Sequence, residues 1–381
     1  MSVKSVSHSI GFPVFSVVCA GNNNEFLVGG GGGGTKAGVK NSVMLFKVDP
    51  ITLELSLSSE FKFSRDDDGC MSIAAHPLKR VFVCGVNGPA DDIKKGVNQN
   101  ARSFRIQNNN IIFTPELTVG TILSKDPIDY QRVCRFSKDG KMFIAGTTDG
   151  HLSFWSWPEM EEALPAYDYP NSEILDIHID HQSSNVVVVT SSKLRLLDLA
   201  KGKVRWSLDD LTVGSAKCEL RSARFGSNSS EGILFVVFNS KGRRESYIRK
   251  FDILDNWKLK KSKQVASKPI TAFNISENGH LLAIGSSDMS VSVLDSNNLS
   301  VLLRIPDAHS FPVTTIDFNT NAAYVISGSA DGTVAISPVP DVNSSSFAVK
   351  CNMLMVFLFV IFVLTIIFII VPIDELDEYE L

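Results

Sequence analysis

Six consecutive glycines, residues 29–34, and the segment Gly38-Val39-Lys40-Asn41 that follows them closely are the part of this chain best suited to recognition or chemistry. Glycine adopts positive φ at little cost but loses more conformational entropy on folding than any other residue. A run of six inside a packed domain therefore implies that something comes close to the backbone there.

Phosphate binding is the first chemistry to consider for this run. A Walker-type loop needs Gly-Lys-Ser/Thr and then a helix whose N-terminal amides face the anion. Here Gly34 is followed by Thr35 and Lys36, the reverse order, and the next run, Ser42–Val48, is short, β-branched and apolar like a strand. A dinucleotide fingerprint is matched by any glycine homopolymer. We predict instead a loop between strands at 25–28 and Ser42–Val48 that presents backbone carbonyls and one polar side chain outward.

Other polar clusters are weaker candidates. Asp66, Asp67 and Asp68 have the composition of a solvated loop, with ion binding as the alternative. His178 and His181 alternate in a strand pattern, which fits a surface pair better than a metal pair. No Ser/His/Asp or Cys/His set has the spacing of a catalytic site, so the sequence predicts neither covalent catalysis nor a small-molecule substrate.

Composition excludes some classes of partner. The chain has 381 residues and a net charge of −4, and five acidic residues lie in the last eight positions. Residues 1–350 thus carry 36 acidic and 37 basic side chains. A nearly neutral body argues against nucleic acid, because phosphate neutralisation needs a basic stripe. The six cysteines are scattered without a Cys-x-x-Cys pair, which favours reduced, mostly buried thiols in the cytosol.

The C-terminal region reads as a membrane anchor. Residues 353–372 are uncharged and almost purely Leu, Ile, Val, Phe and Met, about the length needed to cross the ~30 Å hydrocarbon core as a helix. Lys350 precedes this span and the acidic residues follow it, which favours a cytosolic N-terminal side. We expect a juxtamembrane linker at 341–352, a single transmembrane helix at 353–372 and a short acidic lumenal tail at 373–381.

The region before the anchor is predicted to be all-β and built from repeats. Three segments share the pattern of strand, Gly-Ser/Thr-x-Asp turn and strand, with marker residues Asp149, Asp288 and Asp331. The last two markers are 43 residues apart and the first two 139, close to three periods of ~40 to 45 residues. Such spacing is typical of propeller blades. The markers, and His309, then have a structural role in the blades rather than a catalytic one.

Four further strand pairs complete the count of blades. They lie at 81–85 with 103–106, at 186–190 with 193–199, at 233–238 with 247–253, and on either side of the glycine run. Seven blades of four strands fit residues 1–340 as one closed domain. The predicted fold is therefore an all-β, seven-bladed WD-like β-propeller followed by a single C-terminal transmembrane helix.

The combination of a glycine-rich stretch ending in Gly38-Val39-Lys40-Asn41, a WD-like propeller and a C-terminal anchor resembles a known family. It is similar to the endoplasmic-reticulum guanine-nucleotide exchange factors that activate the Sar-type GTPase of the COPII coat. Residues 11–15 resemble the opening Gly-aromatic-Pro-x-aromatic segment of this family, and residues 308–311 resemble its final-blade entry. The resemblance covers essentially the whole chain, and the glycine loop is its specific part.

The resemblance implies which residues act. In the family the loop is a potassium-stabilised finger that contacts the GTPase. By position, Asn41 matches the essential asparagine, and Gly38 and Val39 match the preceding Gly-aliphatic pair. Gly33, Gly34, Gly38 and Asn41 are then the expected potassium ligands, and the partners are a Sar-type small GTPase and the endoplasmic reticulum membrane. This sequence departs from the family pattern in its six glycines and in Lys40, where several members have proline.

Two other functions remain open at this point. One is a non-catalytic propeller scaffold that assists membrane cargo in leaving the endoplasmic reticulum without exchange activity. The other is a WD-repeat adaptor unrelated to GTPases, which leaves the glycine run without a purpose. The intact Gly38-Val39-Lys40-Asn41 favours the exchange factor.

Overall fold

A computed structural model describes residues 5–21, 24–35 and 38–340. These residues form a propeller of seven antiparallel sheets, as the repeat spacing predicts. Within this described part, no helix is long and apolar enough to cross a membrane. The predicted anchor at 353–372, its linker and the acidic tail lie outside the described residues, so these remain predictions.

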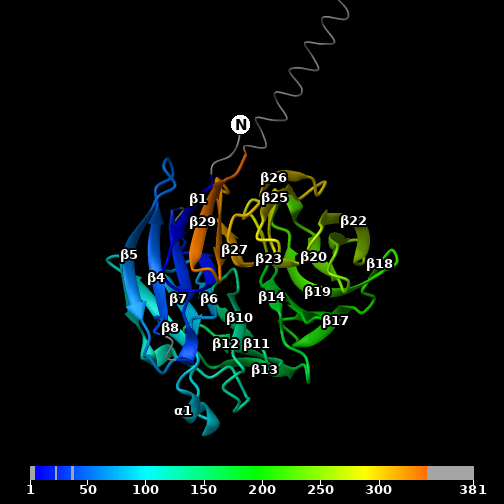
Figure 1. Cartoon of the computed structure of the whole chain (residues 1–381). Helices are drawn as coiled ribbons and strands as arrows, with labels where there is room; N and C mark the ends of the chain where they lie inside the picture. Colours follow the sequence, from blue (N-terminus) through cyan, green and yellow to red (C-terminus); the bar gives the residue numbers. More distant parts are fainter. Residues whose placement is uncertain (1–4, 22–23, 36–37, 341–381) are drawn as a thin grey trace, which may run out of the picture. The chain divides into compact units, whose positions relative to one another are not determined.

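Each sheet is one blade, and its strands follow each other in sequence from the centre of the propeller outward. Figure 1 shows inner strands such as β6, β10, β14 and β23 near the centre and β5, β13, β17 and β22 at the periphery. The strands of blades 1 to 4 are β2 (Val14–Cys19), β3 (Glu25–Gly30), β4 (Ser42–Val48) and β5 (Leu55–Lys62); β6 (Ser72–Ala75), β7 (Val81–Gly85), β8 (Ala101–Gln107) and β9 (Asn110–Phe113); β10 (Gln131–Phe136), β11 (Met142–Thr147), β12 (His151–Ser156) and β13 (Glu162–Asp168); and β14 (Asp176–Ile179), β15 (Asn185–Val189), β16 (Leu194–Asp198) and β17 (Lys203–Leu208).

The remaining blades follow the same order with two exceptions, an added strand in blade 5 and the N-terminal strand as the outermost strand of blade 7. Their strands are β19 (Ala216–Phe225), β20 (Ile233–Ser240), β21 (Ser246–Asp252) and β22 (Lys258–Ala266) in blade 5, extended by β18 (Thr212–Val213); β23 (Ile270–Ile275), β24 (Leu281–Ser286), β25 (Val291–Asp295) and β26 (Val301–Ile305) in blade 6; and β27 (Val313–Phe318), β28 (Tyr324–Ser329), β29 (Thr333–Pro338) and β1 (Val6–Ser9) in blade 7. The short helices are α1 (Ala90–Lys94), η1 (Gly33–Thr35), η2 (Pro115–Leu117) and η3 (Asn228–Ser230).

The ring is closed by its two ends. β1 pairs antiparallel with β29, so the N-terminal strand is the outermost strand of the last blade. A hydrophobic cluster continues across the closure from blade 7 into blade 1, and the rings of Phe26 and Tyr324 lie 6.0 Å apart within it. Joining the first strand to the last blade removes a free sheet edge, which would otherwise be open to pairing with another chain.

Burial explains why these sequences form blades. Middle strands lie between two neighbouring sheets and are apolar on both faces, as in β15, where four consecutive valines, residues 186–189, are fully buried. Outer strands such as β22 are mostly exposed and carry lysines. The marker aspartates hold turns: Asp149 accepts hydrogen bonds from the backbone N–H groups of Leu123 and Ser124, and Asp331 from that of Ser310. Their predicted structural role is confirmed.

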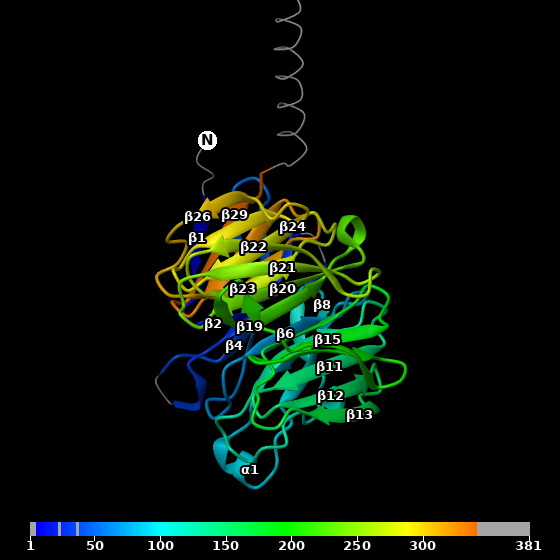
Figure 2. The same cartoon turned by 90° about the vertical axis from the view of Figure 1, so that its right-hand side faces the viewer.

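The antiparallel order places two kinds of connection at the same end of every blade. These are the loop between the second and third strands and the segment that leads into the next blade. The glycine loop joins β3 to β4, so it lies on this face, which we call the loop face. Figure 2 shows this loop, in dark blue, extending away from the body of the propeller.

Candidate functional site

The glycine run divides into two parts with different roles. Gly29 and Gly30 belong to β3 and are buried, because there is no room for a side chain: a Cβ on Gly30 would lie 1.9 Å from the Pro13 carbonyl oxygen. The exposed part begins after Gly31, which has a φ of 150° and lies against the side chain of Asn41. We call residues 31–41 the glycine loop. The predicted loop between two strands is thus confirmed, with the first strand two residues longer than expected.

Asn41 is the internal anchor of this loop. Its Oδ1 accepts a hydrogen bond from the Gly33 N–H at 3.0 Å, and its Nδ2 donates to the Asp67 carbonyl at 2.7 Å. Its own carbonyl accepts from the Phe63 N–H at 2.9 Å. The side chain is only 5% exposed, so the expectation that it points outward is wrong. Its amide instead satisfies backbone groups that the irregular loop leaves without a ladder partner.

The three aspartates behind the loop are not one solvated cluster. Asp66 is exposed, but Asp67 is buried and receives two hydrogen bonds from Arg102, at 2.9 and 2.8 Å. This paired geometry is the strong form of an ion pair between arginine and a carboxylate. The solvated-loop interpretation is therefore wrong for Asp67. Arg102 lies on β8 of the next blade, so the ion pair fixes the segment to which Asn41 is bonded.

Asp68 lies next to the glycines. Its Oδ1 would be 2.8 Å from a Cβ on Gly33, and its carboxylate accepts hydrogen bonds from the backbone N–H groups of Gly69 and Gly34. Burial raises the pKa of this carboxyl group above its usual range, although the two N–H groups act in the opposite direction. The fold thus brings to the loop a carboxylate that the loop sequence itself lacks.

The exposed side of the loop is formed by Gly34, Gly38, Val39 and Lys40. Gly38 has a φ of 79° and nothing within 4 Å of a Cβ position, and Val39 is 38% exposed. The Lys40 ammonium group lies 2.8 Å from a carboxylate oxygen of Glu60. Of the predicted site residues, Val39 and Gly38 are therefore accessible to a partner, while Asn41 positions them.

The loop suits a monovalent ion better than a divalent one. Among the described residues, no three His, Cys, Asp or Glu side chains are grouped as a metal site. What the loop provides is backbone carbonyls, among them that of Gly33, which accepts from the Asn41 Nδ2 at 3.4 Å, and the nearby Asp68 carboxylate, which accepts from the Gly34 N–H. Neutral carbonyl oxygens with few charges are the ligand type found in potassium sites, whereas calcium and magnesium sites use several carboxylates or waters.

The loop is connected to its neighbours on the loop face. The Asp68 N–H donates to the Asn87 carbonyl at 2.9 Å, and the Asn87 side chain donates to the Asp129 carbonyl at 2.7 Å. Four large apolar side chains in connections on the same face are 59–76% exposed: Val97, Leu123, Ile128 and Phe311. Exposed apolar residues on the face of a protruding loop are compatible with a protein interaction surface.

The remaining sequence candidates have structural roles or do not come together. His309 is buried and bonded through both ring nitrogens to Thr333 and Ser327, each at 2.8 Å. His178 accepts a hydrogen bond from the Phe225 N–H, while His181 is exposed. The five described cysteines are free, and all except Cys19 are buried, as expected.

The fold and the site together define a class: a WD-repeat propeller with an anchored, exposed glycine loop. The family model described as "WD domain, G-beta repeat" matches residues 129–156 and 300–336, which include strands of blades 3, 6 and 7.

The similar proteins narrow the class further. The chain is 24% identical over 312 residues to "SEC12-like protein 2" of Arabidopsis thaliana, covering 80% of this chain and 73% of that protein. It is 24% identical over 324 residues to "Guanine nucleotide-exchange factor SEC12" of Candida glabrata, covering 80% and 65%. The rat protein of the same name is 25% identical over 209 residues, covering 52% and 49%. The expected resemblance to the Sec12 exchange factors is thus confirmed, and the chain spans less than two thirds of the Candida and rat proteins.

Proposed function

We propose that this chain is a guanine-nucleotide exchange factor that activates a Sar-type small GTPase at the endoplasmic reticulum membrane and so starts COPII vesicle formation. The observation that carries the proposal is the exposed Gly38-Val39 tip, which is held in place from beneath by Asn41, Asp67 and Arg102. Two of the relatives are named guanine nucleotide-exchange factors, and this supports the proposal.

The mechanism requires binding energy and no covalent step. An exchange factor speeds GDP release only if it binds the opened or nucleotide-free GTPase better than the closed GDP form. A loop that is already ordered binds with a smaller entropy loss than a free one. In this proposal Val39 enters the GTPase, and the apolar side chains Val97, Leu123 and Ile128 form the docking surface beside it.

The loop would hold a potassium ion through the carbonyl oxygens of Gly33, Gly34 and Gly38, together with Asn41. The Asn41 Oδ1 already accepts the Gly33 N–H, so one of its lone pairs is in use, and Asp68 supplies the charge closest to these glycines. The ion's contribution when bound is to neutralise Asp68 and to stiffen the loop. A measurement of thermal unfolding in potassium chloride and in choline chloride tests this without an activity assay. We expect a higher midpoint in potassium that Asp68→Asn abolishes; equal midpoints would contradict the ion site.

The membrane part of the proposal rests on the sequence. Residues 353–372 would anchor the propeller with its N-terminal side in the cytosol and the tail in the lumen. An anchor confines activation to one surface and raises the local concentration of activated GTPase there. Protease protection of the full chain in microsomes tests the orientation: the propeller should be digested from outside and the C-terminus protected.

The decisive experiment is GDP release from a Sar-type GTPase with the full chain in detergent. Val39→Ala should lower the exchange rate by about tenfold or more, because a buried aliphatic contact in the complex contributes about 1.5–3 kcal/mol. Val204→Ala is the matched control, since Val204 is similarly exposed on the outer strand β17 of blade 4. If the unchanged chain releases GDP only at the intrinsic rate, the scaffold function is favoured instead.

A further inference from the structure

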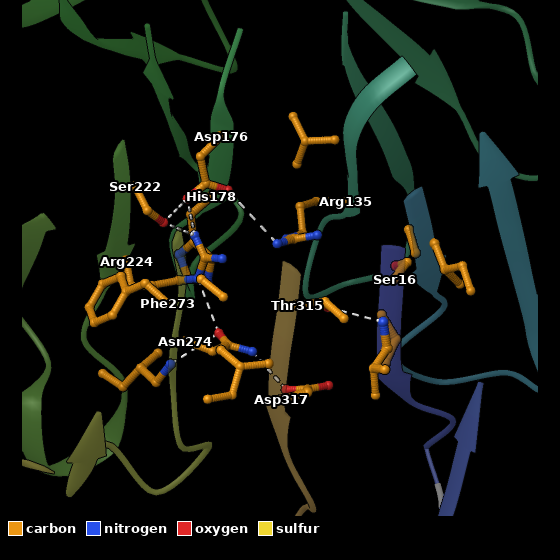
Figure 3. A pocket seen from close by; sticks show the side chains of 18 of the residues that line it. Ser16, Arg135, Asp176, His178, Ser222, Arg224, Phe273, Asn274, Thr315 and Asp317 are labelled. Carbon is orange, nitrogen blue, oxygen red and sulfur yellow. Dashed lines mark hydrogen bonds and ion pairs between the residues drawn. The ribbon is translucent and has the colours of Figure 1, made fainter. Parts of the chain in front are cut away.

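The centre of the propeller contains a second candidate site, independent of the glycine loop. It is a cavity of about 810 Å³ lined by the inner strands of all seven blades. Its wall is charged: five arginine and lysine side chains and three aspartate and glutamate side chains line it. Figure 3 shows the labelled side chains Arg135, Arg224, Asp176 and His178 converging from neighbouring strands.

One ring of residues in this wall, which we call the first tier, consists of the residues at β-bulges of the inner strands. Five inner strands change register at the same place, and the extra residue of each lines the cavity. A bulge re-aims a side chain without interrupting the rest of the strand. The residues at these positions are Phe15, Arg132, Arg221, Thr271 and Thr314.

The structural requirement at the bulge is met by a small hydroxyl group. Thr271 donates to the Val313 carbonyl at 2.6 Å, and Thr314 to the Val14 carbonyl at 2.5 Å, so each threonine ties its blade to the next. Blades 3 and 5 have arginines there instead. Arg132 pairs with Glu173 at 2.9 Å, whereas Arg221 has neither a hydrogen bond nor an ion pair with any described residue. Joining the blades therefore does not require the long cationic side chain of Arg221.

A second pair of arginines lies three residues further along the same strands. Arg224 is buried, donates to the Asp176 carboxylate and packs against the Phe273 ring. Arg135 reaches the same carboxylate only at 3.9 Å. One aspartate therefore serves two guanidinium groups. The hydrogen bonds from Ser222, the Ala223 N–H and Arg224 all go to Oδ2 of this carboxylate, whereas Arg135 faces Oδ1 at a distance too long for a hydrogen bond.

The other acidic groups do not balance this charge. The Asp317 carboxylate accepts from the Cys19 and Phe318 N–H groups and from the Asn274 side chain, and burial raises its pKa. Burial, followed by repulsion from Arg132, lowers the pKa of Arg221 to about 10. Burial and the two arginines Arg224 and Arg135 likewise hold the pKa of His178 well below its usual value. Asp176 and Glu173 favour the charged form of Arg221, but the cavity wall still carries more cationic than anionic side chains.

We propose that this cavity binds a small, multiply phosphorylated anion through Arg132, Arg135, Arg221 and Arg224. A guanidinium group matches two phosphate oxygens at once and keeps its charge when buried. The volume lies within the range of small-molecule sites. Each phosphate ester brings nearly two negative charges, so one compact molecule pairs with four arginines, whereas carboxylates would need a longer peptide. The same chemistry is found in soluble sugar or cyclitol phosphates and in polyphosphorylated lipid headgroups.

The test is calorimetric titration of the full chain in neutral detergent with inositol hexakisphosphate. We expect binding that Arg221→Gln weakens by about tenfold or more, as the loss of a charge-assisted hydrogen bond predicts. Arg135→Gln should weaken it as well. Arg205→Gln is the matched control, because Arg205 is an exposed arginine on the outer strand β17. Without ligand, Arg221→Gln should not lower the unfolding temperature, since no ion pair is lost and a buried cation that Arg132 repels is removed.

The outcomes distinguish a soluble phosphate ligand from a lipid headgroup, and both of these from an acidic protein segment. Tight binding of inositol hexakisphosphate with none of a short-chain phosphatidylinositol bisphosphate supports a soluble ligand, and binding of both supports a lipid headgroup. Equal affinity of Arg221→Gln and the unchanged chain, or no binding at all, overturns the proposal. Displacement of the probe by a hexaglutamate peptide at similar concentration also overturns it, in favour of an acidic protein segment. None of these results depends on exchange activity.

Discussion

Replacing Asn41 by alanine separates the loop's anchor from the loop's exposed tip. The change removes the acceptor of the Gly33 N–H and leaves the Asp67 carbonyl without its donor at 2.7 Å. Two hydrogen bonds at about 0.5–1.5 kcal/mol each give a loss of about 1–3 kcal/mol. If this energy is what holds the tip in its binding conformation, the exchange rate falls by about 5- to 150-fold.

A matched control distinguishes loss of the loop's order from loss of the fold. Asn239 is as buried as Asn41, at 4% exposed, and its Nδ2 donates to the Ile270 carbonyl at 2.9 Å, tying blade 5 to blade 6. Asn239→Ala should cost a similar free energy of unfolding but leave exchange unchanged, because no element of the glycine loop contacts it. Both variants are compared by denaturant unfolding and by GDP release.

Three results would refute this reasoning. Asn41→Ala could retain full exchange, in which case the anchor does not matter for function. Both variants could lose exchange equally, which would show a general effect of destabilisation. Finally, Asn41→Ala could keep its free energy of unfolding while exchange is lost, and then Asn41 would act by contacting the partner directly rather than by holding the loop.

Further predictions follow from single features of the fold. Arg102→Met leaves the Asp67 carboxylate buried and unpaired and should lower the free energy of unfolding by about 3–5 kcal/mol in urea, whereas a loss below about 1 kcal/mol would contradict the buried pair. Gly30→Ala should prevent normal folding because its Cβ would collide with a backbone oxygen, while Gly34→Ala, whose Cβ would lie 3.9 Å from the Asp66 carbonyl oxygen, should unfold at the same temperature as the unchanged chain. Burial holds the pKa of His178 below 6.5, so its contribution to stability is present above pH 6.5 and is lost as the pH falls; His178→Gln should flatten the decline of the unfolding midpoint on acidification.

The blades were predictable because each is defined by local patterns. Strand alternation and the turn markers Asp149, Asp288 and Asp331 lie within single repeats, and the spacing of 43 residues reports the period directly. A closed domain was predicted, but not the strand that closes it. β1 has only four residues, and its partner β29 is more than 300 positions away in the sequence. Nothing in so short a segment indicates which sheet edge it completes.

The site was predictable only where its residues are adjacent in sequence. The glycine loop and its two flanking strands follow from composition, but the orientation of Asn41 depends on Asp67, whose own position depends on Arg102, 35 residues further on. The arginines that line the central cavity were not predicted, for a similar reason. Arg132 and Arg221 are 89 residues apart in sequence, and only the common position of the bulges puts them on one tier.

A run of six glycines serves two opposite physical needs in this chain. Gly29 and Gly30 are required because the neighbouring backbone and side chains leave no space, so there the run increases packing density. Beyond Gly31 the same residue type leaves an exposed loop that would cost much entropy to order on binding. Bonds from Asn41 to Gly33 in the loop and to Asp67 outside the loop reduce that cost before any partner arrives. Sensitivity to substitution should therefore be greatest at the strand glycines and the anchor, and the exposed glycines should tolerate replacement wherever their φ is negative.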